Sequence, residues 1–429
     1  MPGDFGPFIG PDRYEAIWGS NLDSMIDAAV VLERSPPQLE PPKVIPNEDA
    51  DALLMLASLS AGMSRETSTQ GFFPPQEEGP SDPPGDWEPR GGFLNPISDR
   101  PQRLRSELAG RTGWDTISNS SGTAIERSLA VVATLGHGSL GLVEEVEIPG
   151  VNGISFVRKR VLLPHHRRVQ RLAIVQAEAK IVEDLVHTHI IHIIGTYETT
   201  PKTGVPSFSL LMWPVAQKDL SAFLNEYPED QSNKQERKTW LVQWPACLIS
   251  ALAYIHSQGI RHQDIKPSNI ICHATGKIFF TDFSSSARFN PLNTTSTENP
   301  ARTSAMYSAS EVLDRLDVDD TYQRHGTGSD IFSLGCVFIE MLVVRAGYSV
   351  EKFHACLAEL DGRAGLPYAH MLDSTVAFIM SMTEFNRGFF LVEVVRDMVK
   401  KARKERPSAQ LVKSRISDWY GIRCTCAEP

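Results

Sequence analysis

The sequence predicts an α+β protein in which a small β-rich lobe with one key helix precedes a larger helical lobe. Two observations predict this fold class. Strand-like runs surround a single helical stretch at residues 164–186, and helical periodicity prevails beyond residue 219. A β-rich lobe followed by a helical lobe has a natural cleft between the two.

The first part of the chain differs in composition from the rest. Residues 1–34 are expected to contain a helix, because apolar side chains in 11–34 recur near a 3.6-residue period. This helix packs either on the main domain or on a partner protein. Residues 35–127 are expected to form a largely disordered linker, because its many prolines remove backbone donors and fix φ. A short helix over 50–63 is the expected exception.

The main domain is predicted to cover residues 128–421, and a flexible tail follows at 422–429. The small lobe covers about 128–213 and the large lobe about 214–421. The small lobe is expected to hold the runs with strand character, which are residues 128–136, 141–148, 154–163, 189–198 and 207–215.

Charge and hydropathy exclude several classes of protein. The 429 residues carry a formal net charge of −10. A broad nucleic-acid-binding surface is therefore not expected, because such a surface needs clustered excess Lys and Arg. The basic run 158–171 is interpreted as a solvated helix face.

The apolar run 331–344 is too short to span a bilayer and contains Glu340, which indicates a buried core helix. No signal peptide is recognised at the N-terminus, so an intracellular protein of the cytoplasm or the nucleus is expected.

Six cysteines are scattered along the chain without the C-x-x-C spacing of a zinc site, and they indicate no disulfide framework. The C-terminal pair Cys424 and Cys426 could bind a metal, but it is interpreted as a reduced, flexible end. His187, His189 and His192 could suggest a metal, but they are interpreted as ordinary residues of a helix-to-strand turn.

A glycine pattern lies between the first two strand-like runs. Gly136, Gly138 and Gly141 form G-x-G-x-x-G, and glycines let the backbone approach phosphate oxygens closely. A dinucleotide-binding turn would need a helix directly afterwards. Residues 142–148 alternate like a strand instead, so a hairpin lid over a nucleotide is favoured.

A buried ion pair is predicted inside the small lobe. Strand alternation places Lys159 on one face with Val157, where a cation needs a partner. In the following helix, Glu178 lies within an apolar stripe that also contains Val175 and Val182. An unpaired carboxylate would be costly there, so Glu178 is expected to bind Lys159.

Four side chains in two later segments could perform phosphoryl transfer. Asp264, Lys266 and Asn269 follow an apolar helix, and Asp282 follows a strand-like run. Asp264 can accept a hydroxyl proton, and Lys266 can neutralise a transferring phosphoryl group. Asn269 and Asp282 offer the oxygen ligands that Mg²⁺ prefers.

In this order, the glycine loop, the strand Lys, the helix Glu, the catalytic loop and the Mg²⁺ loop resemble a eukaryotic protein kinase over residues 128–420. The D-x-K-x-x-N spacing resembles the serine/threonine group, and the divergent style resembles kinases common in fungal genomes. The resemblance implies a protein kinase fold that uses ATP and Mg²⁺ and acts on Ser/Thr hydroxyls of protein substrates. A separate hypothesis, which does not compete with catalysis, is that the N-terminal 105 residues recruit protein partners through the helix with Trp18 or through the Pro-rich segments.

The resemblance also implies an adenine site at the hinge between the lobes. Met212 would gate the back pocket, while the Trp213 carbonyl and the Val215 amide would bind the base. The other residues assigned to the nucleotide are Leu135, Gly136, Gly138, Gly141, Val143, Val157, Lys159, Asp219 and Ile271.

Further family positions have structural roles. Asp330 would anchor the backbone of the catalytic loop, and Arg406 would be the buried partner of Glu311. Val182, Ile193, His262 and Phe283 would stack as an internal spine that joins the lobes.

The chain departs from the family pattern at four positions. Gln263 replaces an Arg that usually binds an activation-loop phosphate, Ser284 replaces a Gly, Ser310 replaces a Pro and Val157 replaces an Ala. These changes motivate a second hypothesis, a pseudokinase scaffold that binds nucleotide or partners without catalysis. The Ser/Thr-rich segment with Thr294, Thr295, Ser296, Thr297 and Thr303 is either a flexible loop or a phosphorylation site whose phosphate Arg167 and Arg168 could receive. Activity is predicted not to depend on a phosphate at Gln263.

Overall fold

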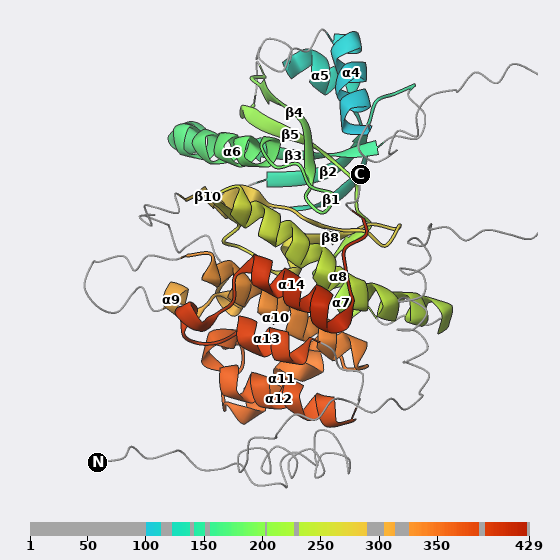
Figure 1. Cartoon of the computed structure of the whole chain (residues 1–429). Helices are drawn as coiled ribbons and strands as arrows, with labels where there is room; N and C mark the ends of the chain where they lie inside the picture. Colours follow the sequence, from blue (N-terminus) through green and yellow to red (C-terminus); the bar gives the residue numbers. More distant parts are fainter. Residues whose placement is uncertain are drawn as a thin grey trace, which may run out of the picture.

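A computed structural model of the chain describes residues 100–112, 122–137, 141–150, 155–201, 204–226, 231–289, 304–313, 326–385 and 391–426 (Figure 1). The helices expected at residues 11–34 and 50–63 lie outside these ranges, as do Gly138 and the five Ser/Thr residues between 294 and 303.

A five-stranded antiparallel sheet forms the small lobe, with the strand order β1-β2-β3-β5-β4. The strands are β1 (Ala130–His137), β2 (Gly141–Glu147), β3 (Ser155–Leu162), β4 (His192–Thr199) and β5 (Ser207–Trp213). The central strand β3 pairs with β2 and β5, and its Val157 and Val161 are buried. All five strands were expected from the sequence within a few residues.

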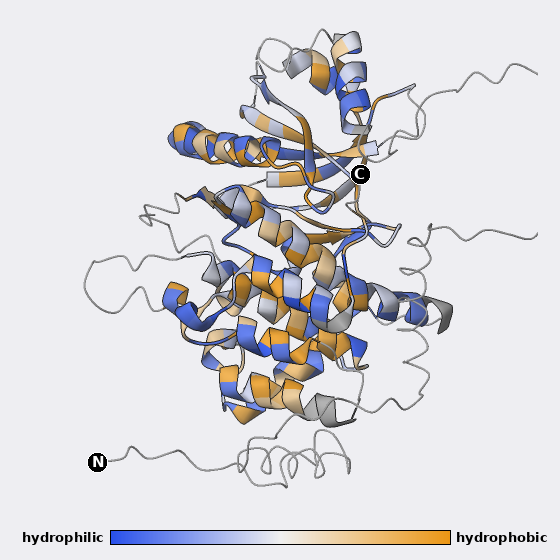
Figure 2. Ribbon diagram, viewed as in Figure 1, coloured by the Kyte–Doolittle hydropathy of each residue, from blue (hydrophilic) through white to orange (hydrophobic). Residues whose placement is uncertain are grey.

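One helix, α6 (Arg168–Glu183), packs against this sheet after the short 3₁₀ turn η2 (His165–Arg167). Its apolar stripe is buried, including Val175, Val182 and the carboxylate residue Glu178. Figure 2 shows apolar and polar residues alternating around α6, as expected of a helix with one buried side.

Two more helices cover the other side of the small lobe. Helices α4 (Arg100–Thr112) and α5 (Gly122–Ser128) pack on each other and on β4 (Figure 1). Leu104, Leu108 and Ile125 form a separate apolar core with sheet residues such as Phe156 and Leu211. Over residues 100–112 and 122–127 the structure therefore differs from the disordered linker predicted for 35–127, because these residues bury enough apolar surface to fold onto the sheet.

Helices form most of the large lobe (Figure 1). They are α7 (Leu220–Asn225), α8 (Gln231–Ser257), α9 (Ser310–Leu313), α10 (Gly328–Arg345), α11 (Val350–Leu360), α12 (Leu372–Phe385), α13 (Val392–Met398) and α14 (Ala409–Tyr420). Helix α10 contains the apolar run 331–344, and nearly every residue of it is buried, as predicted for a core helix. In the described ranges no single helix could cross a membrane; only α10 and α11 together, bent by 113°, have the required length and composition.

Short strands carry the functional loops of the large lobe. The strands β6 (Lys218–Asp219), β8 (Ile270–Cys272) and β9 (Ile278–Phe280) form one sheet, and β7 (Ile260–Arg261) pairs with β10 (Ala287–Arg288). Between α6 and β4, Ile190 forms a parallel bridge with Phe280 of β9. The chain of the small lobe is thus hydrogen-bonded to the large lobe, and one apolar core extends through both. The predicted α+β two-lobed fold class is confirmed.

Candidate active site

The small lobe supplies a buried ion pair to the site. Lys159 Nζ donates to Glu178 Oε1 at 2.7 Å, and both residues are less than 5% exposed. Strand β3 places the ammonium on the side that α6 covers, and the α6 stripe places the carboxylate opposite it. The predicted pairing of Lys159 with Glu178 is confirmed, and each charge compensates the desolvation of the other.

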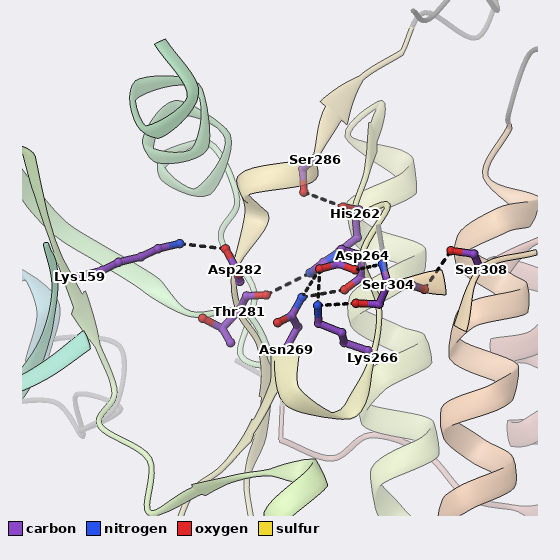
Figure 3. A network of polar contacts seen from close by, with 10 residues as sticks. All are labelled: Lys159, His262, Asp264, Lys266, Asn269, Thr281, Asp282, Ser286, Ser304 and Ser308. Carbon is purple, nitrogen blue, oxygen red and sulfur yellow. Dashed lines mark hydrogen bonds and ion pairs between the residues drawn. The ribbon is translucent and has the colours of Figure 1, made fainter. Parts of the chain in front are cut away.

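Asp282 connects this pair to the large lobe. Lys159 Nζ donates a second hydrogen bond to Asp282 Oδ1 at 2.8 Å, which Figure 3 shows. Asp282 has a left-handed backbone, with φ of 56°, and precedes the 3₁₀ turn η4 (Phe283–Ser285). Burial disfavours its charge, but the Lys159 ammonium outweighs this and lowers the pKa of Asp282 to about 2. The same carboxylates raise the pKa of Lys159 above its ordinary value despite its burial.

The catalytic loop brings three predicted side chains together between β7 and β8 (Figure 3). Lys266 Nζ donates to Asp264 Oδ2 at 2.8 Å. Asn269 Nδ2 donates to the Asp264 carbonyl at 2.8 Å and to Asp264 Oδ2 at 2.9 Å. Both of these acceptors require the NH₂ side of the amide, so the Asn269 Oδ1 atom is directed away from Asp264.

Asp330 in α10 holds the backbone of this loop. Its Oδ2 accepts from the His262 N–H and its Oδ1 from the Gln263 N–H, each at 2.9 Å. His256 Nε2 lies 2.9 Å from the same carboxylate. The predicted anchoring role is confirmed. Gln263 has a positive φ of 68°, which is uncommon for a side chain of this type and which these contacts stabilise.

Ser304 is a site residue that sequence reasoning missed. Its backbone N–H donates to Asp264 Oδ1 at 3.0 Å, and its Oγ accepts from Lys266 Nζ at 2.6 Å (Figure 3). Ser308 Oγ donates to the Ser304 carbonyl at 3.0 Å. Nothing in the local sequence distinguishes Ser304 from the other hydroxyl residues of its segment. These contacts hold Ser304, which directly follows the Ser/Thr-rich segment that ends at Thr303, against the catalytic loop.

Two further predicted contacts connect distant parts of the domain. Arg406 makes a bidentate pair with Glu311, at 2.7 and 3.0 Å, as predicted. The rings of His262 and Phe283 lie 4.7 Å apart, while Val182 and Ile193 are buried in the same core as Phe283. Burial lowers the pKa of His262, which favours the neutral ring in this position.

The residues assigned to adenine come from strands of both lobes. Val157 of β3 lies opposite Met212 of β5, and both are buried. Val143 on β2 is half-buried and Leu135 on β1 is 41% exposed. Trp213 ends β5, Val215 lies in the connection to β6, and Ile271 lies on β8.

Asp219 has a structural contact that the sequence interpretation did not include. It lies opposite Ile271 in the β6–β8 pair, and its Oδ1 accepts from the Ala222 N–H at 2.7 Å. The carboxylate therefore caps the N-terminus of α7.

The two glycines of the hairpin that the structure describes, Gly136 and Gly141, are needed for different reasons. Gly136 leaves room for a ligand to approach the backbone, and Gly141 leaves room for the neighbouring strand. A Cβ on Gly136 would meet no atom within 4 Å, so the space beside it is open. A Cβ on Gly141 would lie 2.0 Å from the Arg160 carbonyl oxygen, so this glycine is required by the pairing of β2 with β3.

Comparison with known proteins agrees with this geometry. The family model described as protein kinase domain matches residues 129–415. Mitogen-activated protein kinase kinase kinase 1 of Arabidopsis thaliana is 28% identical over 260 residues, which cover 59% of this chain and 39% of that protein. Mitogen-activated protein kinase kinase kinase 17 of the same plant is 29% identical over 182 residues, which cover 42% of this chain and 45% of the relative. Cell division control protein 7 of Schizosaccharomyces pombe is 26% identical over 215 residues, or 50% of this chain and 18% of the relative.

The chain thus spans less than half the length of these relatives. The family match covers most of the chain, and the protein belongs to the eukaryotic protein kinase family.

Proposed function

We propose that the protein is an active serine/threonine protein kinase that transfers the γ-phosphate of Mg-ATP to hydroxyl groups of proteins. The observation that carries this proposal is the position of Lys159 Nζ, which bonds Glu178 of the small lobe and Asp282 of the large lobe at once. This contact sets the two halves of a phosphoryl-transfer site against each other. The D-x-K-x-x-N spacing of the catalytic loop supports Ser/Thr acceptors.

Lys159 would bind the phosphates of ATP. Its ammonium stays charged because Glu178 and Asp282 raise its pKa above the ordinary value. Glu178 acts as a positioning residue, because it holds the Lys159 side chain without facing the substrate. A cation that two carboxylates hold in place needs little reorganisation when phosphate arrives.

Asp264 would orient the acceptor hydroxyl and accept its proton. Its carboxylate accepts from the Ser304 N–H and from the Asn269 and Lys266 side chains. Two carboxylate oxygens offer about four acceptor positions, so one remains for the hydroxyl. Lys266, adjacent to that carboxylate, would neutralise charge on the transferring phosphoryl group.

Asn269 and Asp282 would hold Mg²⁺, which supplies charge neutralisation at the phosphates when bound. The donor set fits this ion, because an amide oxygen and a carboxylate are hard oxygen ligands. Asn269 directs its Oδ1 away from Asp264, and Asp282 keeps its charge because its pKa is lowered to about 2.

A pseudokinase scaffold is the second candidate. Gln263, Ser284 and Ser310 favour it, because each replaces a residue that the family usually has. The described geometry argues against it, because Gln263 receives the Asp330 anchor through its backbone and needs no arginine side chain for that contact. The side chains assigned to chemistry are all present in the sequence.

The deciding experiment compares the wild-type protein with Asp264→Asn, which keeps the shape of the side chain but removes its basicity. With Mg-ATP and a generic protein acceptor, the variant should incorporate phosphate about 10²–10⁴-fold more slowly. Phosphoamino-acid analysis should find phosphoserine or phosphothreonine. Equal incorporation by both proteins would exclude the enzyme and leave the scaffold.

A further inference from the structure

Three cysteines and one histidine form a second cluster outside the catalytic site, which we name the His189 cluster. It consists of His189, Cys247, Cys424 and Cys426. His189 lies in the connection between α6 and β4, Cys247 lies inside α8, and the two other cysteines follow α14. The four atoms able to bind a metal, one nitrogen and three sulfurs, all lie within 4.8 Å of one another.

We propose that the His189 cluster is a tetrahedral Zn²⁺ site. Three thiolates and one imidazole are a ligand set that structural zinc sites use. Ligand atoms at ordinary Zn–S and Zn–N distances lie roughly 3.5–3.8 Å from each other in a tetrahedron. No two of the four atoms are more than 4.8 Å apart, so side-chain rotations that shift them by about 1 Å would complete the coordination.

The histidine is held in the orientation that a metal ligand requires. Its Nδ1 lies 2.7 Å from the Ile278 carbonyl oxygen, to which only a protonated nitrogen can donate. The lone pair is then on Nε2, which faces Cys424 Sγ at 3.0 Å. A hydrogen bond from the second ring nitrogen to a carbonyl is a common feature of zinc-binding histidines. His189 is fully buried, and its own carbonyl accepts from the Phe280 N–H at 2.9 Å.

The C-terminal segment is docked where it can supply two of the four ligands. Helix α14 ends at Tyr420, and the next residue, Gly421, has a φ of 65° that turns the chain away from the helix axis. Beyond it, Ile422, Cys424 and Cys426 pack against the main core. Figure 1 shows this segment, in red, running from α14 toward the junction of the lobes. The structure here differs from the flexible tail that the sequence predicts.

The site would join elements that the chain brings together only by folding. His189 and Cys424 are 235 residues apart in the sequence, and Cys247 belongs to a third segment. A zinc ion would tie α8 and the C-terminal segment of the large lobe to the connection that directly follows α6. Cys247, Cys424 and Cys426 are not in disulfide bonds, so their three sulfurs are available as ligands.

Metal analysis of the full-length chain tests the proposal. Protein produced with zinc in the medium and purified under reducing conditions should retain about one zinc per chain after dialysis against metal-free buffer. The double variant Cys424→Ala/Cys426→Ala should retain almost none. The matched control is Cys356→Ala, which removes a buried thiol in α11 outside the cluster and should retain zinc as the wild type does.

Two further measurements keep the result independent of folding defects and of kinase activity. Cobalt substitution of the wild type should give the absorption of a tetrahedral cobalt–thiolate centre, and the double variant should lack it. A strong chelator should lower the melting temperature of the wild type but not of the double variant. Wild-type protein with no more zinc than the double variant, or with iron instead, would overturn the proposal. A disulfide between two of the three cysteines in freshly purified, metal-free protein would also overturn it.

Discussion

Two neighbouring residues of β3 carry buried cations that point to opposite faces of the sheet and have different surroundings. Lys159 meets Glu178 and Asp282 on the side of α6. Arg158 meets Glu144 of β2 at 2.8 Å and Glu126 of α5 at 3.1 Å. Both cations are less than 5% exposed. One strand thus buries two positive charges, each with two carboxylates.

The two clusters differ in what their charges connect. Lys159 joins the small lobe to the large lobe, because Asp282 lies 123 residues further along the chain. Arg158 joins the sheet to α5, and Tyr197 donates to Glu126 at 2.6 Å within the same cluster. Burial and the adjacent Glu126 raise the pKa of Tyr197 to about 12, so its hydroxyl remains a donor. We infer that the first cluster serves the reaction and the second serves stability.

The largest effect is expected from Arg158→Met. Removing this cation leaves the buried carboxylate of Glu144 without its nearest cation, which costs about 3–5 kcal/mol of unfolding free energy. Glu126 keeps its contacts with Arg160 and Tyr197. Urea denaturation measures the loss. Arg160→Met is the control, because its side chain is 29% exposed and its pairs with Glu126, at 2.8 Å, and with Glu144, at 3.4 Å, should together contribute about 1 kcal/mol or less. Equal losses in the two variants would contradict the distinction.

Lys159→Met is expected to act on activity. Loss of one preorganised phosphate-binding cation should lower the rate of phosphate transfer about 10²–10³-fold. Arg158→Met is the comparison, measured below its unfolding temperature and normalised to folded protein, and it should keep its rate. If Arg158→Met lost as much activity as Lys159→Met, the two faces of β3 would not be separable in function.

The smallest effect concerns the acid stability that Asp282 provides. Its pKa is about 2 in the folded protein against 3.8 ordinarily, so the folded state takes up this proton at a lower pH than the unfolded state does. The Asp282 charge therefore adds about 2 kcal/mol to the free energy of unfolding above pH 4, and this contribution is lost as the pH falls from 4 to 2. The difference in unfolding free energy between wild type and Asp282→Asn should narrow over that range. A difference that stays constant between pH 6 and pH 3 would contradict the lowered pKa.

The sequence predicted the Lys159 cluster because each partner has a local signal. Alternation in a strand and a carboxylate inside an apolar helical stripe both follow from periodicity, and burial then requires the pair. The anchoring by Asp330 and the pair of Arg406 with Glu311 were implied by the family resemblance, and the structure confirms both contacts.

The Arg158 cluster, Ser304 and the His189 cluster lacked such signals. Glu126 lies in a stretch that composition assigned to a linker, and its helix is stable only because the sheet offers an apolar surface. Ser304 is one of several hydroxyl residues in its segment. The ligands of the His189 cluster come from three separate segments, so no spacing rule applies to them. In each case the missing information is a contact that only tertiary structure creates.

The position of α5 has a practical consequence for anyone cutting the gene to produce the catalytic part alone. The family match begins at residue 129, one residue after α5 ends. A fragment that starts there lacks Glu126 and uncovers Phe156, Ile194 and Leu211, which the helices otherwise bury. Such a fragment would expose a hydrophobic patch to solvent, together with an arginine that has lost one of its two carboxylate partners, and it would aggregate during expression. An expressed fragment should therefore begin before residue 100, so that it keeps helices α4 and α5 on the sheet.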